Sequence, residues 1–166
     1  MKYVHNTLMH DEKLILYTRP HRIVFAPIFL WLIISLLILI YGPSLGLNTV
    51  TLLLDIPLHI LLSFGAFIIA ILHAISSFIV YVTSEYAVTD KRVLMKIGLI
   101  RRNSLEIFLD KIESIHVRQS VPGRILNFGS IVISGTGGSK DPFNYIPRPL
   151  HFRRQVQEQI EKLAKK

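Results

Sequence analysis

Hydrophobic side chains dominate the first half of the chain in two long runs that contain no lysine or arginine. Between Arg22 and Lys91 the only side chains expected to be ionised at neutral pH are Asp55, Glu85 and Asp90. A charge near the centre of a bilayer costs on the order of 3 kcal/mol or more, whereas a soluble domain of this basic character would place Lys and Arg over such a stretch. The distribution therefore predicts that this segment lies in a membrane.

The two runs have the lengths of membrane-spanning helices. Residues 23–41 and 56–82 are separated by a loop that begins with turn chemistry, Gly-Pro-Ser-Leu-Gly, at residues 42–46. At 1.5 Å per residue the first run spans a hydrocarbon core of about 30 Å, and the second exceeds that core and must tilt or project beyond it. The pattern predicts a transmembrane helical hairpin over residues 23–82, after a polar cytoplasmic lead-in at residues 1–22.

Small side chains repeat along one face of the second run. Ala66, Ala70 and Ala74 recur every four residues, and small residues at that spacing let two helices approach closely. We expect the first run to pack on this alanine stripe. The stripe could instead serve a homodimer, and the sequence leaves both arrangements open.

The second half changes towards alternation, with turn residues every several positions. The predicted strands are residues 85–89, 93–97, 104–109, 112–119, 130–134 and 142–146. After Pro149 the period becomes helical, and one apolar stripe contains Phe152, Val156, Ile160 and Leu163. We therefore expect residues 83–166 to form a cytoplasmic α+β domain in which the terminal helix covers an apolar sheet face.

Basic residues flank the hydrophobic block rather than interrupt it. Residues 1–22 carry a net charge of +2, residues 23–82 carry −1 and residues 83–166 carry +7. Because the loop between the runs has no Lys or Arg, the positive-inside rule predicts a two-pass protein of the cytoplasmic (inner) membrane with both termini cytoplasmic. Cations beside a bilayer suit anionic lipid headgroups. Nucleic acid is not expected as a partner, because no Lys/Arg-rich helix or aromatic RNP-like motif is present.

Several short motifs follow one another in the second half in a specific order. They are Thr89-Asp90-Lys91-Arg92, Gly98-Leu99, Leu109-Asp110-Lys111-Ile112, Gln119-Ser120, Gly123-Arg124 and Gly129. In this order and spacing the chain resembles the bacterial pleckstrin-homology-like (bacterial PH) domain membrane proteins. The lead-in also resembles that family, with Glu12 followed by Pro20-His21 before a two-helix anchor.

The resemblance implies a PH-like split β-barrel, made of two packed antiparallel sheets and capped by the C-terminal helix. It also implies a binding or assembly module rather than an enzyme. The chain departs from the family pattern at Arg148, which lies between two prolines. Relatives often carry an acidic residue there, which can cap the free N–H groups of the last helix.

One hairpin turn of the predicted sheet combines apolar and cationic residues. The predicted strand that follows the second apolar run rises about 3.3 Å per residue, so the turn at its end should lie about 20 Å from the bilayer. The next strand returns towards the headgroups. The returning tip consists of Leu99, Ile100, Arg101 and Arg102. Because arginine suits phosphate through its bidentate fork, this tip is the predicted lipid-binding site. The alternative is that the apolar pair packs on the barrel and the arginines face water.

Four further cations are secondary candidates for headgroup contact. Lys91 and Arg92 stand at the distant hairpin turn, and Arg153 and Arg154 stand on the terminal helix. The alternative for all four is an ordinary solvated surface.

No pattern in the sequence indicates a metal, a cofactor or a catalytic site. His59 and His73 lie roughly 21 Å apart along one helix and cannot share a metal ion. His73 could have a proton-linked role, with a neutral hydrogen-bonded imidazole as the alternative. The Gly-rich residues 135–140 lack the glycine directly before lysine that a phosphate-binding loop requires. The absence of cysteine excludes disulfides, thiolate metal sites and cysteine nucleophiles.

The sequence therefore predicts a membrane-anchored PH-like binding or scaffold module. Its ligand is expected to be membrane lipid headgroups, a partner protein or a second copy in a homo-oligomer. Two alternatives remain: an accessory subunit of a larger membrane complex in transport or envelope stress, and, less favoured, an enzyme on lipid substrates.

Overall fold

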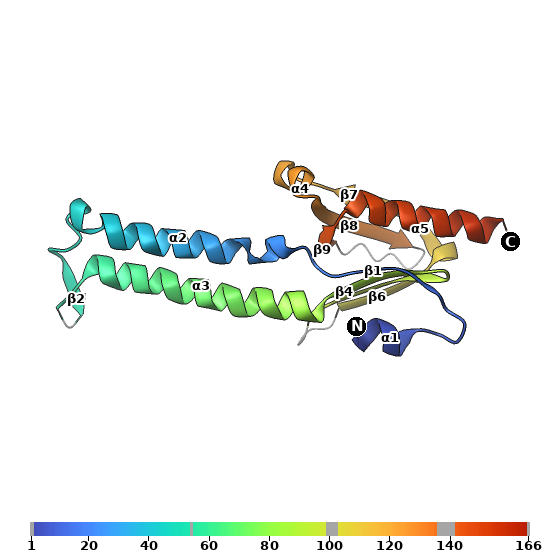
Figure 1. Ribbon diagram of the computed structural model, residues 1–166, viewed down its shortest axis with the longest axis horizontal. Helices are drawn as coiled ribbons and strands as arrows, with labels where there is room; N and C mark the ends of the chain where they lie inside the picture. The colour runs from blue at the N-terminus through green and yellow to red at the C-terminus, as the bar shows by residue number, and fades with distance from the viewer. Residues whose placement is uncertain (1, 54, 99–102, 136–141, 166) are drawn as a thin grey trace. The chain divides into compact units, whose positions relative to one another are not determined.

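The computed structural model describes residues 2–53, 55–98, 103–135 and 142–165, which divide into two compact units (Figure 1). The helical unit comprises Arg22–Phe78, and the β-domain comprises Met1–His21 together with Ile79–Lys166. The β-domain is thus assembled from two pieces of chain that lie on either side of the helical unit in the sequence.

The helical unit is an antiparallel pair of apolar helices. A short 3-10 turn, η1 (Arg22–Phe25), leads into α2 (Ala26–Tyr41), and α3 (Leu58–Thr83) begins in this unit and ends in the β-domain. Their connection contains η2 (Pro43–Leu45) and a two-stranded ribbon of β2 (Thr51–Leu53) and β3 (Ile56–Pro57). The helical stretches of 20 and 26 residues are long and apolar enough to cross a membrane.

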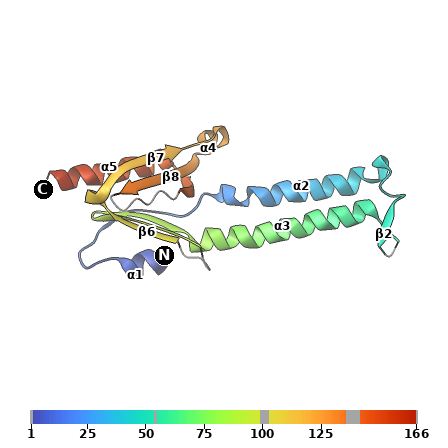
Figure 2. The same cartoon turned by 180° about the vertical axis from the view of Figure 1, so that it is seen from behind.

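Small residues line the contact between α2 and α3, which lie side by side (Figures 1 and 2). Ser35 Oγ of α2 donates to the Ser63 carbonyl at 2.9 Å, and Ser63 Oγ of α3 donates back to the Ser35 carbonyl at 3.0 Å. Ala66 and Ala70 are buried, whereas Ala74 is partly exposed. The alanine stripe therefore faces α2 at Ala66 and Ala70, and reciprocal serine hydrogen bonds extend it.

The β-domain contains two antiparallel sheets. The four-stranded sheet has the order β1 (Leu14–Thr18), β4 (Glu85–Thr89), β5 (Arg92–Ile97) and β6 (Asn103–Phe108). The three-stranded sheet has the order β7 (Ile112–Arg118), β8 (Phe128–Gly135) and β9 (Phe143–Pro147). The helical elements of this domain are α1 (Lys2–Thr7), η3 (Leu109–Lys111), α4 (Val121–Ile125) and α5 (Pro149–Ala164).

Both sheets and α5 contribute to one hydrophobic core. Tyr86 from β4 meets Phe143 from β9 edge to face, with ring centroids 6.3 Å apart. Phe152 and Val156 of α5 are fully buried in the same core, while Leu163, near the end of the helix, is exposed. The terminal helix thus covers the sheets as expected, through Phe152, Val156 and the partly buried Ile160, and only the last member of the predicted stripe is exposed.

The N-terminal segment belongs to the β-domain, which differs from the predicted division of the chain with residues 1–22 as a separate lead-in. β1 pairs antiparallel with β4 in the register Leu16↔Val88 and Thr18↔Tyr86. Strand β1 is only five residues long, and its partner follows both apolar helices. Six strands form where alternation predicts them: β4 has the predicted bounds, and the other five differ by one or two residues at an end. The short elements α1, β1, β2, β3 and α4 are additional.

Candidate functional site

Arg92 is the centre of a buried ion-pair network and is not available to lipid, which corrects its prediction as a secondary headgroup contact. Its side chain is only 5% exposed. Arg92 Nε and Nη2 donate to the two carboxylate oxygens of Glu12, each at 3.0 Å, and Nη1 donates to Glu106 Oε2 at 2.8 Å. The guanidinium fork is therefore used within the fold, where it ties the N-terminal segment to β5 and β6.

The turn motif that begins at Thr89 completes this network. Thr89 Oγ1 lies 2.7 Å from Glu12 Oε1 and 2.8 Å from the Arg92 carbonyl, and it accepts a hydrogen bond from the Arg92 N–H at 2.9 Å. Burial alone would raise the pKa of Glu12, but hydrogen bonds from Arg92, the Met9 N–H and Thr89 outweigh it, so the pKa lies below its ordinary value. The motif Thr89-Asp90-Lys91-Arg92 thus holds the N-terminal segment on the β-domain.

The remaining predicted cations differ in exposure, and two of them lie outside the described residues. The Arg154 side chain is 76% exposed and pairs with Glu158 one turn away, Nε to Oε1 at 2.9 Å. Arg153 is partly buried, and its Nε has no hydrogen-bond partner among the described residues. Lys91 is partly exposed. The predicted lipid-contacting tip, Leu99 to Arg102, lies outside the described residues.

Other residues of the signature build the one-turn helix α4. Ser120 caps α4, because its Oγ accepts from the Gly123 N–H at 3.2 Å. A Cβ on Gly123 would lie 2.6 Å from the Phe128 carbonyl oxygen, so only glycine allows this close approach. Gln119 Nε2 donates to the same Phe128 carbonyl at 3.1 Å. The motif therefore folds the β7–β8 connection back onto the start of β8.

The fold of α4 turns apolar and cationic side chains outward. Val121 is 71% exposed and Ile125 77% exposed, and Leu126 directly after the helix is also exposed. Arg118 and Arg124 are exposed beside them and form no ion pair among the described residues. We call this surface, Arg118, Val121, Arg124, Ile125 and Leu126, the α4 edge.

A shallow hollow of about 380 Å³ adjoins the α4 edge on the outer face of the β7–β8–β9 sheet. Its lining includes Arg118 of β7 and Asn144 and Tyr145 of β9, residues whose side chains carry hydrogen-bond donors. Tyr145 adopts a left-handed φ of 59°, which is rare for a residue with a large side chain. The hollow is therefore chemically suited to an anion.

The α4 edge lies close to the point where the chain leaves the β-domain. His21 is the last residue of the first β-domain piece. Its N–H donates to the Tyr145 carbonyl at 2.6 Å, and its ring stacks on Phe128 with centroids 5.4 Å apart. Phe128 in turn receives the hydrogen bond that folds α4 back. Pro20-His21 of the lead-in is thus anchored on the strand that supports α4.

A family model described as Bacterial PH domain matches residues 23–163, which is most of the chain. The chain belongs to the bacterial PH domain family. The match includes the apolar helices, and it begins after β1 and Glu12. No curated protein and no solved structure matches the chain.

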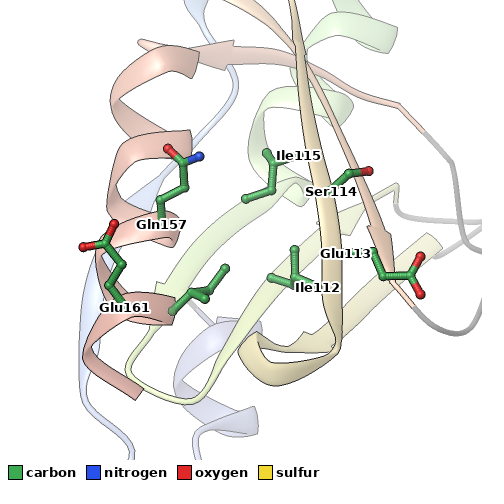
Figure 3. Close-up of a pocket in the computed structure, with 7 residues that line it drawn as sticks. Ile112, Glu113, Ser114, Ile115, Gln157 and Glu161 are labelled. Carbon is green, nitrogen blue, oxygen red and sulfur yellow. The ribbon is translucent and has the colours of Figure 1, made fainter. Parts of the chain in front are cut away.

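The β-domain also has a groove between its edge strand β7 and the covering helix α5 (Figure 3). The groove measures about 460 Å³. Ile112 and Ile115 point from β7 towards α5, where Gln157 and Glu161 line the other wall. A register irregularity between Ile112 and Ser114 allows the two isoleucines to share one face. In the order β7–β8–β9 the outer edge of β7 has no strand neighbour among the described residues.

The described residues contain no group of three or more His, Asp or Glu side chains that could hold a metal ion. PH-like domains typically bind rather than catalyse.

Proposed function

We propose that the protein is a membrane-anchored binding module. In this proposal α2 and α3 cross the cytoplasmic membrane as a hairpin, and the β-domain stands on the cytoplasmic side. Its ligands are the lipids of that membrane or a partner protein.

The pairing of β1 with β4 is the observation that supports this arrangement best. Strand β1 precedes the first apolar helix and β4 follows the second, yet both belong to one antiparallel sheet. The chain between them must therefore leave the domain and return to the same side. Two antiparallel helices of membrane-spanning length satisfy this requirement, whereas a single crossing would place the two strands on opposite sides.

The charge distribution supports the cytoplasmic side. The loop between the helices carries no Lys or Arg, and the flanking pieces carry net charges of +2 and +7. Positive charge is retained in the cytoplasm during insertion.

Single cysteines can test the topology cleanly because the chain has none. We expect a membrane-impermeant maleimide to label Leu45→Cys, which lies in the exposed η2 turn, in spheroplasts with an intact inner membrane. His10→Cys and Lys165→Cys, both at exposed positions, should react only after the membrane is permeabilised. Labelling of either terminal cysteine from outside, or release of the protein by an alkaline wash, would contradict the proposal.

A second candidate is supported by the groove beside β7: an accessory subunit that docks a partner protein. An open strand edge beside a groove lined by isoleucines and polar side chains can accept an extended segment, and Glu161 on the rim favours a segment with basic residues. A photoactivatable crosslinker on Gln157→Cys, at the groove, should capture a defined protein in native membranes. The matched probe on Ser104→Cys, exposed on the other sheet, should not. Equal capture from both positions would count against docking at the groove.

A further inference from the structure

We infer that the α4 edge of the bacterial PH domain inserts among the anionic phospholipid headgroups of the same membrane that holds α2 and α3. This inference rests on the proposed function, because the anchor supplies the membrane. It assigns a role to residues outside the tip that the sequence suggested.

The first argument is chain continuity. His21 contacts Phe128 and Tyr145, and the next residue, Arg22, begins the first apolar stretch. If that stretch enters the bilayer, the end of the β-domain that holds His21 lies at the headgroup layer. Phe128 is both the stacking partner of His21 and the acceptor that folds α4 back. The α4 edge is therefore held at this end by two contacts within the β-domain.

The second argument is the chemistry of the α4 edge. A water-soluble surface does not normally project several large aliphatic side chains from one turn, and such patches mark interaction sites. At the level of the headgroups, Val121 and Ile125 could bury their exposed surface in the acyl boundary. Arg118 and Arg124 would then meet phosphates, to which the arginine fork binds in a bidentate manner.

One further cation, Arg148, lies at the same end of the β-domain. Arg148 is exposed and is held in a left-handed conformation with a φ of 47°, with its N–H bonded to the Asn127 carbonyl at 2.8 Å. Asn127 directly follows Leu126 of the α4 edge. The anion-suited hollow beside Arg118 and Tyr145 provides a site for a headgroup phosphate. A lipid surface of negative potential matches this concentration of positive charge.

Charge also argues against a second copy of the chain as the occupant. A two-fold contact would bring the same patch of two molecules together. Arg118 and Arg124 would then face their own copies, and the described residues of the α4 edge supply no carboxylate to neutralise them. An anionic bilayer is the complementary surface.

Tryptophan quenching in the full-length protein tests the inference. The chain has a single tryptophan, Trp31 in α2, so Trp31→Phe provides a silent background. In that background Ile125→Trp reports on the α4 edge. Phe108→Trp is the matched control, because Phe108 is also exposed but pairs with Arg92 at the opposite end of β5 and β6. The proteins are reconstituted in nanodiscs whose acyl chains are brominated near the glycerol end.

We expect Ile125→Trp to be quenched in discs that contain phosphatidylglycerol and phosphatidylethanolamine, and Phe108→Trp to remain unquenched. Adding Arg118→Gln and Arg124→Gln should weaken the contact about 30-fold at moderate salt, as expected for two cations beside an anionic surface. Arg154→Gln, an exposed arginine on α5, should change nothing. Val121→Trp serves as a second reporter if Ile125→Trp disturbs the fold.

The outcomes separate this inference from the proposed function. If native Trp31 is quenched but Ile125→Trp and Val121→Trp are not, the anchor stands and the inference is wrong. If Trp31 itself is unquenched, the membrane anchor fails and the inference fails with it. If Ile125→Trp becomes buried in detergent micelles in a manner that depends on protein concentration, a second copy covers the α4 edge and the inference is overturned.

Discussion

Replacing Arg92 by methionine should loosen the N-terminal segment from the β-domain. Methionine keeps much of the length and apolar stem of arginine but removes all three donors to Glu12 and Glu106. The Glu12 side chain is fully buried. It would therefore keep its Met9 and Thr89 hydrogen bonds and lose its only ion-pair partner among the described residues.

The two ion pairs of Arg92, with Glu106 and with Glu12, contribute differently to stability. Glu106 is 36% exposed at its side chain, so water can replace Arg92 there and that arm contributes little. Glu12 has no such access, and breaking a buried pair from one side costs about 3–5 kcal/mol. Taking the lower figure, because two hydrogen bonds remain, the opening of β1 from β4 should become about 100-fold more frequent, since 1.4 kcal/mol is about a factor of ten.

Hydrogen exchange of the full-length protein in nanodiscs measures this opening. Peptides that cover Leu14–Thr18 should exchange about 100-fold faster in Arg92→Met under conditions where exchange follows local opening. Arg154→Met is the matched control, because it also removes an arginine–glutamate pair, but an exposed one within a helix turn. That pair is worth about 0.5 kcal/mol or less.

The pH dependence gives a second, independent readout. In the native protein the pKa of Glu12 is lowered from 4.5, so its stabilisation is fully present above that value and is lost as the pH falls through the folded-state pKa. In Arg92→Met, burial would instead raise the pKa of Glu12. The cost of burying an unpaired Glu12 carboxylate then disappears once this carboxyl is protonated. The difference in β1 exchange rate between Arg92→Met and the native protein should therefore shrink as the pH falls from about 7 to about 3. Unchanged exchange of β1, or a difference independent of pH, would refute this account of the network.

Two further substitutions test the packing of each unit. Gly123→Ala places a Cβ 2.6 Å from the Phe128 carbonyl oxygen and should destabilise the α4 turn by about 1–3 kcal/mol, measured as faster hydrogen exchange in α4 and early β8. The control Gly65→Ala has open space around its Cβ and should not destabilise the protein. Equal effects of the two substitutions would contradict the close approach at Gly123. Ser35→Ala and Ser63→Ala should each weaken the helix pair by about 0.6–2 kcal/mol in steric-trapping measurements. The double variant should cost less than the sum, and strict additivity would argue that the serines do not pair.

The sequence predicts those elements whose signal is local. The apolar helices follow from composition, and the strands from β4 to β9 follow from alternation bounded by turn residues, as at the start of β8, where partly exposed and buried positions alternate from Phe128 to Ile131. The cover by α5 follows from its single apolar stripe. These features need no knowledge of distant parts of the chain.

The features that the sequence does not reveal depend on distant partners or on very short segments. Arg92 resembles a surface cation at a hairpin turn, and only its pairing with Glu12, 80 residues earlier, explains its burial. Strand β1 is five residues long and lacks a local partner. Helix α4 contains both a proline and a glycine, which oppose a helical prediction, and it forms because Gln119 and Ser120 hold it.

The interleaved order of the β-domain makes its completion a check on membrane insertion. In the proposed topology β1 is synthesised first and stays unpaired until both hydrophobic helices have left the ribosome and β4 follows. If only one helix inserts, β1 and β4 lie on opposite sides of the membrane and cannot pair. Their unpaired edges are then exposed to aggregation and proteolysis. In this topology only a chain with both helices inserted can pair β1 with β4, so completion of the sheet depends on insertion.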